Sequence, residues 1–304
     1  MIEAAAFPNL AYLVDVQLSV FPEHEEYLTR RFEKASDDEM EIAEDLALKA
    51  RQIVGGRLES VCESYKWLSG AIIEEEFYFR RNGRYRLSSF EEAYNQIYAN
   101  EAYMTRYVEG ILLSQIWWAN HCATIKYFRE QFIAGNPPGF SHLEVGPGHG
   151  LFLFYASESA NCGSITGWDV SSASLKSTSE CLRAMGVTKK ITLRKVNLLD
   201  APDETFDSIT FSEVLEHLED PLEALKILHR VLNPGGRIMI NAPVNSPAPD
   251  HIYLFNTPEE VIDIIVEAGF EIEQSMFSTV SGDSLERSRK LKSTISAVVI
   301  ATRG

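Results

Sequence analysis

Three glycines and an acid stand close together near the middle of the chain, in the run LEVGPGHG at residues 143–150. A short β-branched stretch precedes the run and a helical stretch follows it. Glycine is favoured where a backbone turns sharply and lies against a ligand with no side chain between them. The N-terminus of a helix offers free N–H groups and positive potential to an anionic group. The run therefore predicts a ligand-binding loop between a strand and a helix, although a tight turn with no ligand has the same local pattern.

The spacing of the glycines separates two kinds of ligand. Gly146, Gly148 and Gly150 give G-x-G-x-G, and Glu144 lies two residues before the first of them. A dinucleotide-binding loop has G-x-G-x-x-G, with the pyrophosphate on the helix end. The spacing argues against a nicotinamide oxidoreductase.

A second acid, Asp169, ends the next expected strand, twenty-five residues after Glu144. A carboxylate at this point of a Rossmann-like fold accepts hydrogen bonds from ribose hydroxyls. Ser171 and Ser172 follow, so an N-cap role for Asp169 is the alternative. We favour the ribose role because of the position at the strand end.

The whole run from residue 141 to about 275 resembles a known family. E-x-G-x-G-x-G is similar to motif I of class I S-adenosylmethionine-dependent methyltransferases. The fourth strand, FDSITFS, is followed by EVLEHLEDP and LHRVLNPGG, and later by DHIYLF, TPEE and AGF. These stretches resemble, in the same order, the methyltransferases of ubiquinone and menaquinone biosynthesis.

The resemblance implies S-adenosylmethionine as the cofactor and a set of residues that bind it. In the family, the end of the third strand carries an acid that holds the adenine amino group; this chain has Asn197 there and Asp200 three residues later, and both stay open. The residues that we expect to bind the cofactor are Glu144, Gly146, Pro147, Gly148, His149, Gly150, Asp169, Val170, Asn197, Leu198, Asp200, Ser212 and Glu213.

Two histidines are the candidates for proton removal from an acceptor. His217 follows the fourth strand and His251 follows the fifth. Histidine titrates near neutral pH, so it can act as a general base. His217 is equally compatible with an ordinary helix-start position. Glu213 and Glu216 flank it, but two ligands at helical spacing are too few for a metal site, so we expect no metal.

Residues before 136 have a helical rhythm. Ser36–Glu39 and Ser88–Glu91 read as capping boxes, and from Asn100 to Cys122 apolar residues recur with the helical period. Aromatic residues in such a pattern are usually core. Tyr107 and Gln115 are also placed to cover the methionine end of the cofactor, and Trp118 and His121 to line an acceptor pocket.

After residue 140, short β-branched runs alternate with helical stretches, which predicts a parallel sheet covered on both faces. The resemblance implies a Rossmann-like α/β fold with seven strands in the order 3-2-1-4-5-7-6 and the seventh antiparallel. We expect a helical lid domain at 1–136 and the cofactor-binding domain at 137–304. The turn Asn233–Gly236 should precede strand five, and the last two strands show no clear helix between them.

Composition limits the partners. Twenty-eight Lys and Arg against 44 Asp and Glu give a net charge of −16, which repels nucleic acid and anionic lipid. Four widely spaced cysteines predict buried thiols in a reducing compartment. Neither a signal peptide nor a membrane span is expected, so we expect a cytoplasmic protein. A homodimer stays open.

Together these features predict methyl transfer to a small organic acceptor in cofactor or natural-product biosynthesis. O-, N- and C-methylation are all left open. Protein or RNA acceptors are the first alternative, although the [DNS]-P-P-[YFW] sequence of enzymes that methylate base amino groups is missing after strand four. A non-catalytic, cofactor-binding regulatory subunit is the second.

Overall fold

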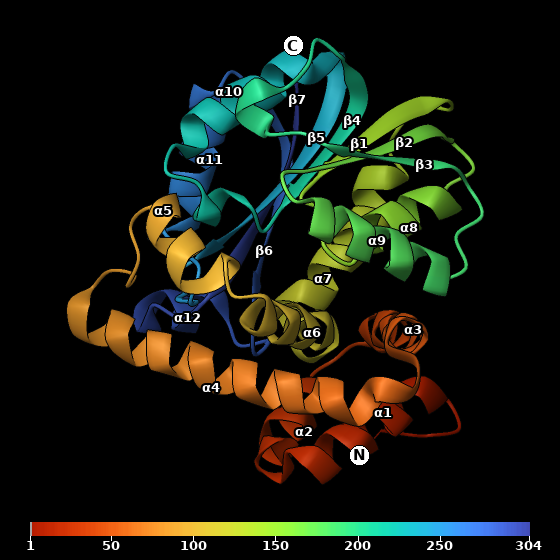
Figure 1. Ribbon diagram of the computed structural model, residues 1–304, viewed down its shortest axis with the longest axis vertical. Coiled ribbons are helices and arrows are strands. Elements are labelled where there is room, and N and C mark those ends of the chain that lie inside the picture. The colour runs from red at the N-terminus through yellow and green to blue at the C-terminus, as the bar shows by residue number, and fades with distance from the viewer. Residues whose placement is uncertain (1) are drawn as a thin grey trace. The chain divides into compact units, whose positions relative to one another are not determined.

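The structure is a computed structural model that describes residues 2–304 (Figure 1). These residues form two compact units. Unit 1 holds the described residues up to Lys126 together with Ser246–Leu254 and Ser278–Ile295. Unit 2 holds Tyr127–Asn245, Phe255–Phe277 and Ser296–Gly304. The expected domain division between residues 136 and 137 stays a prediction.

Unit 1 is helical. Its long helices pack in pairs, α1 against α3 and α4, and α4 against α6. A π-helical turn, η3, connects α5 to α6. The helices and turns of this unit are α1 (Pro8–Val20), η1 (Pro22–His24), α2 (Glu25–Glu33), α3 (Asp37–Val54), η2 (Gly55–Arg57), α4 (Leu58–Asn82), α5 (Phe90–Ala93), η3 (Tyr94–Tyr98), α6 (Glu101–Trp117) and α12 (Leu285–Leu291), while α7 (Ala119–Tyr127) ends at the junction with unit 2.

Local capping explains where several of these helices begin. Ser36 accepts from the N–H of Glu39 while Glu39 bonds back to Ser36, which confirms the first capping box. The second cap lies one residue later than expected, because Ser89, not Ser88, accepts from the N–H of Glu92. The pattern from Asn100 to Cys122 is also not one helix: Trp118 has ψ 125° and separates α6 from α7.

Unit 2 contains a seven-stranded mixed sheet in the order β3-β2-β1-β4-β5-β7-β6, which confirms the expected Rossmann-like fold. Helices α8 and α9 lie on one side of it and α10 and α11 on the other (Figure 1). The elements are η4 (Phe128–Ile133), β1 (Phe140–Val145), α8 (Leu151–Glu158), β2 (Cys162–Asp169), α9 (Ser172–Ala184), β3 (Ile191–Lys195), η5 (Leu198–Asp200), β4 (Phe206–Ser212), η6 (Leu215–His217), α10 (Pro221–Val231), β5 (Leu232–Val244), α11 (Pro258–Glu267), β6 (Glu271–Thr279) and β7 (Ile295–Thr302).

Two details differ from the sequence-based expectation. The turn Asn233–Gly236 is an irregularity inside β5, because Phe206 pairs with Leu232 and Ser208 with Arg237. The expected absence of a helix between the last two strands is wrong: Ser284 caps α12, which lies between β6 and β7. The Thr257 cap that opens α11 is confirmed, since Thr257 accepts from the N–H of Glu260.

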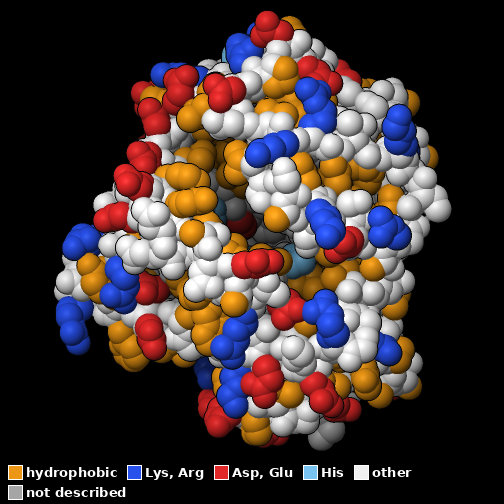
Figure 2. All heavy atoms as spheres, in the orientation of Figure 1, with side chains coloured by type: hydrophobic (Ala, Val, Ile, Leu, Met, Phe, Trp, Pro, Cys, Tyr) orange, Lys and Arg blue, Asp and Glu red, His pale blue; other side chains and the backbone are white. Residues whose placement is uncertain are grey.

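The surface carries charges of both signs. On the face drawn in Figure 2, Lys and Arg side chains are interspersed with acidic ones and form no continuous stripe. All four cysteines are buried with free thiols, as expected. No helix among residues 2–304 is both long enough and apolar enough to cross a membrane.

Candidate functional site

The register of the sheet brings the predicted cofactor residues of unit 2 to one edge. Val145 at the end of β1 pairs with Trp168 of β2 and with Phe211 of β4. Asp169 pairs with Lys195 at the end of β3, and Ser212 pairs with Asn241 of β5. All of these pairs are parallel, so the strands end side by side. The glycine loop, Asp169, Asn197 and Glu213 therefore leave the sheet at the same edge, where open α/β sheets bind ligands.

The three glycines of the loop serve different purposes. All three have left-handed backbone, with φ of 71°, 49° and 73° at Gly146, Gly148 and Gly150. A Cβ on Gly146 would lie 2.9 Å from a methyl group of Val214, and one on Gly150 would lie 3.1 Å from Leu182. Among residues 2–304, a Cβ on Gly148 would meet no heavy atom within 4 Å except those of its two chain neighbours. Packing thus requires the outer glycines, and only the middle one faces open space.

The rest of the loop is held by backbone hydrogen bonds. The N–H of Gly146 donates to the carbonyl of Trp168 at 2.8 Å, which ties the loop to β2. The N–H of Gly150 donates to the carbonyl of Pro147 at 2.6 Å, which closes the turn around His149. The loop is therefore formed by the chain itself, as a preorganised binding loop must be.

Glu144 lies beneath this loop as a buried acid. It is 3% exposed, and its Oε2 has no hydrogen-bond partner among the described residues. Burial raises the pKa of this carboxyl well above its ordinary value, and a hydrogen bond from the N–H of Leu153 lowers it in part. Unsatisfied buried carboxylate oxygens are costly, so this acid either holds a proton or receives a donor or a cation from a ligand.

Asp169 is oriented by the start of α9. Its Oδ1 accepts from the N–H of Ser171 at 2.7 Å, and its Oδ2 accepts from the hydroxyl of Ser174 at 2.7 Å. Burial raises the pKa of Asp169, and these two hydrogen bonds lower it in part. The N-cap of α9 is Ser171, which accepts from the N–H of Ser174. Asp169 is therefore not the N-cap, and each of its oxygens keeps a lone pair for a further donor.

The residues after β3 form a small polar group. The Nδ2 of Asn197 donates to Asp200 at 3.1 Å, and the N–H of Leu199 donates to Asn197 at 3.2 Å. Asn197 thus caps the short turn η5, in which Leu198 is buried. Asn197 and Asp200, the two candidates for the adenine contact, are hydrogen-bonded to each other, and the choice between them stays open. Val170, beside Asp169, is 55% exposed.

Glu213 follows β4 in a strained conformation. Its φ of 54° is unusual for a residue other than glycine, and strain of this kind is concentrated at functional sites. Asn241 holds it: the Nδ2 of Asn241 donates to Oε1 of Glu213 at 2.8 Å and to the hydroxyl of Ser212 at 3.0 Å. Burial raises the pKa of Glu213, and the bond from Asn241 lowers it in part. No sequence motif marks Asn241, and only the pairing of β4 with β5 reveals its contact.

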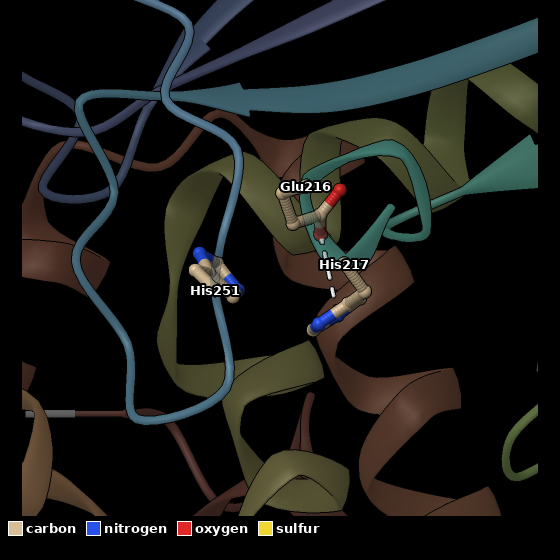
Figure 3. A group of neighbouring side chains, drawn as sticks. All are labelled: Glu216, His217 and His251. Atoms are coloured by element: carbon tan, nitrogen blue, oxygen red, sulfur yellow. Dashed lines mark ion pairs between the residues drawn. The ribbon is translucent and has the colours of Figure 1, made fainter. Parts of the chain in front are cut away.

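Of the two candidate bases, His217 belongs to unit 2. It lies in η6 beside Glu216, with 3.7 Å between its Nε2 and the Oε1 of the buried glutamate (Figure 3). This places an imidazole and a carboxylate, both residue types that metals bind, next to each other. The expectation that no metal binds therefore stays a prediction.

The second candidate base, His251, lies on the Ser246–Leu254 segment of unit 1. It is 6% exposed, and its Nδ1 is 2.6 Å from the carbonyl of Ser246. Because a carbonyl only accepts, Nδ1 is the donor and carries hydrogen. The ring also lies edge-on to Tyr85, with 5.9 Å between the centroids.

The predicted pocket residues of unit 1 fall into two groups. Tyr107 donates to Asp250 at 2.7 Å, and Tyr98 donates to the other oxygen of the same carboxylate at 3.2 Å. Burial and this negative charge raise the pKa of Tyr107 well above its ordinary value. Tyr107 is thus part of a buried tyrosine–aspartate cluster inside the unit. Its role toward a cofactor stays a prediction.

The second group lies at the break between α6 and α7. His121 has its Nδ1 3.2 Å from Nε2 of Gln115, and its ring centroid lies 4.9 Å from that of Trp118. Trp118 donates to the hydroxyl of Tyr65 at 3.0 Å. Burial lowers the pKa of His121 to about 4, so the imidazole is neutral at pH 7. The structure brings Gln115, Trp118 and His121 together, and their role toward an acceptor stays a prediction.

The fold and the site together define a class. The strand order and the glycine loop at the carboxyl edge are those of a class I, Rossmann-like methyltransferase fold. Residues 143–240 match the family model described as a methyltransferase domain. Unit 2 is therefore a class I methyltransferase domain, and S-adenosylmethionine is the cofactor of that class.

Two curated relatives are similar to part of this chain. The ubiquinone/menaquinone biosynthesis C-methyltransferase UbiE of Enterobacter sp. (strain 638) is 39% identical over 74 residues, which cover 24% of this chain and 30% of the relative. The ubiquinone biosynthesis O-methyltransferase of Alkalilimnicola ehrlichii is 32% identical over 125 residues, which cover 40% of this chain and 47% of the relative. The chain thus spans less than half the length of these relatives.

Two solved structures share the fold at low identity. The N-methyltransferase NodS from Bradyrhizobium japonicum, in complex with S-adenosyl-L-homocysteine, is 16% identical with a TM-score of 0.51, covering 70% of this chain and 98% of that one. The pyocyanin biosynthetic protein PhzM is 16% identical with a TM-score of 0.55, covering 80% of this chain and 72% of that one.

Proposed function

We propose that this protein transfers the methyl group of S-adenosylmethionine to a small organic acceptor, in cofactor or natural-product biosynthesis. One observation carries the cofactor part of the proposal. Gly148 faces open space at the sheet edge where the Asp169 carboxylate keeps two unused acceptor positions. A ligand with a ribose diol beside a group that lies flat on the loop fits that arrangement.

The proposed contacts to the ribose, the adenine and the methionine end of the cofactor come from different residues along the edge of the sheet. The loop residues 146–150 lie against the ligand, Asp169 accepts from its ribose hydroxyls, and Val170 and Leu198 flank the adenine beside Asn197 and Asp200. Glu144, Ser212 and Glu213 face the methionine end. The orphaned Oε2 of Glu144 supports this assignment, because a cationic or N–H-bearing ligand group would remove the cost of burying it. Tyr107 and Gln115 complete the set from unit 1.

Methyl transfer requires few catalytic groups from the protein. Bound S-adenosylmethionine would supply its methyl carbon to a lone pair or carbanion of the acceptor, and the electron pair of the broken carbon–sulfur bond would stay on sulfur in S-adenosylhomocysteine. The cofactor supplies an activated methyl group, so the chain must align the acceptor and exclude water. His217 and His251 are our candidates for removing the acceptor proton, and Trp118 and His121 for lining the acceptor.

The proposal of a small acceptor rests on two supports. The curated relatives are named as methyltransferases of ubiquinone and menaquinone biosynthesis, and both quinones are small organic molecules. A net charge of −16 also disfavours polyanionic acceptors, because phosphate backbones bind through clustered Lys and Arg. A protein acceptor, RNA and a non-catalytic regulatory role remain as outcomes of the experiment.

Calorimetry with S-adenosylhomocysteine, followed by turnover assays, tests the proposal. The assays would follow S-adenosylhomocysteine release with three acceptor panels: phenols and quinols, amines, and extracted protein or RNA. We expect saturable 1:1 binding and turnover on a small molecule only. Binding without turnover on any panel would favour the regulatory role. Binding of NAD in place of S-adenosylhomocysteine would refute the cofactor assignment.

A further inference from the structure

One face of α9 contacts both parts of the proposed cofactor site. Ser174, Thr178 and Leu182 are spaced four residues apart and so share this face. Ser174 donates to Asp169 at 2.7 Å, and Thr178 donates to the carbonyl of Gly148 at 2.7 Å. The side chains of Leu182 and Thr178 lie 3.1 and 3.2 Å from the position that a Cβ on Gly150 would occupy. The same helix face thus supports the ribose-side carboxylate and the glycine loop.

We propose that Ser174 and Thr178 are positioning residues through which α9 couples Asp169 to the glycine loop, so that the ribose and the loop contacts form as one unit. The inference rests on the proposed function and extends it to residues that would touch no ligand themselves.

The Ser174 contact orients the carboxylate of Asp169. One donor reaches each oxygen, Ser171 on Oδ1 and Ser174 on Oδ2, so the plane of the carboxylate is fixed. The N–H of Ser174 in turn donates to the Ser171 hydroxyl, which fixes Ser174 within the first turn of α9. A carboxylate held in this way presents its remaining lone pairs in a set direction, as a bidentate contact to two neighbouring hydroxyls requires.

The Thr178 contact orients the loop. A helical threonine commonly bonds back to the carbonyl four residues earlier, and Thr178 lies 3.0 Å from that carbonyl of Ser174. Its hydroxyl also reaches Gly148, at the shorter distance of 2.7 Å. In a trans peptide the C=O and the next N–H point in opposite directions. With the Gly148 carbonyl held toward α9, the N–H of His149 points away from the helix.

A purely structural role for these hydroxyls makes a different prediction. If Ser174 only stabilised the first turn of α9, its removal would lower stability and weaken every ligand of the site equally. If it orients Asp169, its removal selectively weakens ligands that carry the ribose hydroxyls. Comparing S-adenosylhomocysteine with its 2′-deoxy analogue distinguishes the two roles.

The experiment measures the affinity of the full chain for both compounds by calorimetry. We expect the wild type to prefer S-adenosylhomocysteine, and Ser174→Ala to reduce that preference by about fivefold to tenfold, a loss within the range of one ordinary hydrogen bond. Ser174→Thr keeps a hydroxyl and should retain the wild-type preference for S-adenosylhomocysteine. Ser172→Ala, an exposed serine of the same helix, is the matched control and should change neither affinity.

Thr178→Val tests the other half of the coupling. This variant keeps the size of the side chain and should weaken S-adenosylhomocysteine about fivefold and the 2′-deoxy analogue less, while Thr178→Ser retains wild-type binding. In an Asp169→Asn background, the factor by which Thr178→Val weakens S-adenosylhomocysteine binding should be at least about threefold smaller than in the wild type, because the loop and the carboxylate are coupled. Thermal unfolding of each variant confirms that it is folded.

Two results would overturn the inference alone: an unchanged preference in Ser174→Ala, or full additivity of Thr178→Val and Asp169→Asn, in a wild type that binds S-adenosylhomocysteine. Equal weakening of both compounds by Ser174→Ala is one form of the first result, and it would assign Ser174 a structural role. A wild type that binds neither compound would overturn the proposed function itself.

Discussion

At the scale of single residues, the middle glycine of the loop is the position where a side chain can be added to the proposed ligand space without forcing a change in the backbone. Gly148 has φ 49°, and no heavy atom of the described residues beyond its two chain neighbours lies within 4 Å of the place of its missing Cβ. Asparagine tolerates left-handed backbone better than other residues with a side chain. Gly148→Asn should therefore fold, while its side chain occupies space proposed for the cofactor.

We expect Gly148→Asn to weaken S-adenosylhomocysteine binding at least about a hundredfold, or about 2.7 kcal/mol, with little change in melting temperature. Gly186→Asn is the matched control, since Gly186 has φ 80° and equally open surroundings but lies beyond the far end of α9. Calorimetry on both variants is the measurement. Wild-type affinity in Gly148→Asn would remove the loop from the site.

Another residue, His142, gives a prediction about pH. It is fully buried in β1, with its Nδ1 3.1 Å from the hydroxyl of Ser208. Burial lowers the pKa of His142 to about 3, from 6.5 in the unfolded chain. Below pH 6.5 the unfolded state therefore binds more protons than the folded state. Stability from this residue is complete above pH 6.5 and is lost as pH falls toward 3, by about 1.4 kcal/mol per pH unit.

The comparison of wild type with His142→Gln isolates this effect. His24 and His121 also have pKa values lowered by burial, to about 4, but both variants contain them. Urea unfolding at pH 7, 6 and 5 should show the wild type losing stability faster than His142→Gln. Parallel pH curves for the two proteins would mean that His142 is not held neutral by its burial.

At the scale of elements, the sequence predicted what depends on local signals. Ser36 and Glu39 predicted the start of α3, and Thr257 with Pro258 predicted the start of α11. The resemblance of residues 141–275 to a known family gave the strand order. The sequence predicts the cap of α5 one residue early, at Ser88, because Ser88 and Ser89 both precede a glutamate by three residues and only the folded chain selects Ser89.

The site was predictable only in part, for the same reason. Glycine spacing and the strand-end acid mark the loop and Asp169, because those roles depend on residue type at a fixed offset. Asn241, Ser174 and Thr178 act through contacts across strands or along α9, and Ser and Asn are too common for their type to reveal them. Likewise, the break at Trp118 interrupts an apolar period that runs on unchanged through it.

The contact between α4 and α6 supports a prediction at this scale. A Cβ on Gly110 of α6 would lie 2.9 Å from Leu68 and 3.1 Å from the carbonyl of Ser64, both in α4. Gly110→Ala should force the helices apart and cost about 1–3 kcal/mol. Gly70 lies inside α4, and apart from its chain neighbours and the adjacent helix backbone no described atom lies within 4 Å of its Cβ position. Gly70→Ala should therefore gain roughly 0.5–1 kcal/mol from helix propensity.

Chemical denaturation of both alanine variants measures these effects. Opposite signs for two Gly→Ala changes in one helix pair would show that close approach, not backbone entropy, sets the requirement at Gly110. A stabilising effect of Gly110→Ala would show that α4 and α6 do not pack as closely as this contact requires.

At the scale of the whole molecule, the two units are interlaced along the chain. Unit 1 includes two segments that come from between strands, Ser246–Leu254 after β5 and Ser278–Ile295 before β7. Both bond to the N-terminal helices within that unit. Asp250 accepts from Tyr98 and Tyr107, and the carbonyl of Val280 accepts from the N–H of Ala119 at 2.9 Å. A single boundary drawn along the sequence at 136/137 cannot assign these two segments to the helical unit, because both follow it in the chain.

This interlacing predicts the behaviour of a fragment. Residues 137–304 retain both segments but lose their helical partners, so Asp250 loses both tyrosine donors and Asp283 loses its ion pair with Lys34. Ile252, which packs beside the small core of Leu87, Ala93 and Ile97, would be exposed as well. We expect the fragment to aggregate or to unfold without cooperativity, as seen by calorimetry and by binding of a hydrophobic dye.

Replacing each segment by a short Gly/Ser linker should reduce dye binding, because the orphaned groups are then gone. A cooperative transition in the unmodified fragment, with S-adenosylhomocysteine affinity equal to that of the full chain, would instead establish residues 137–304 as an independent domain.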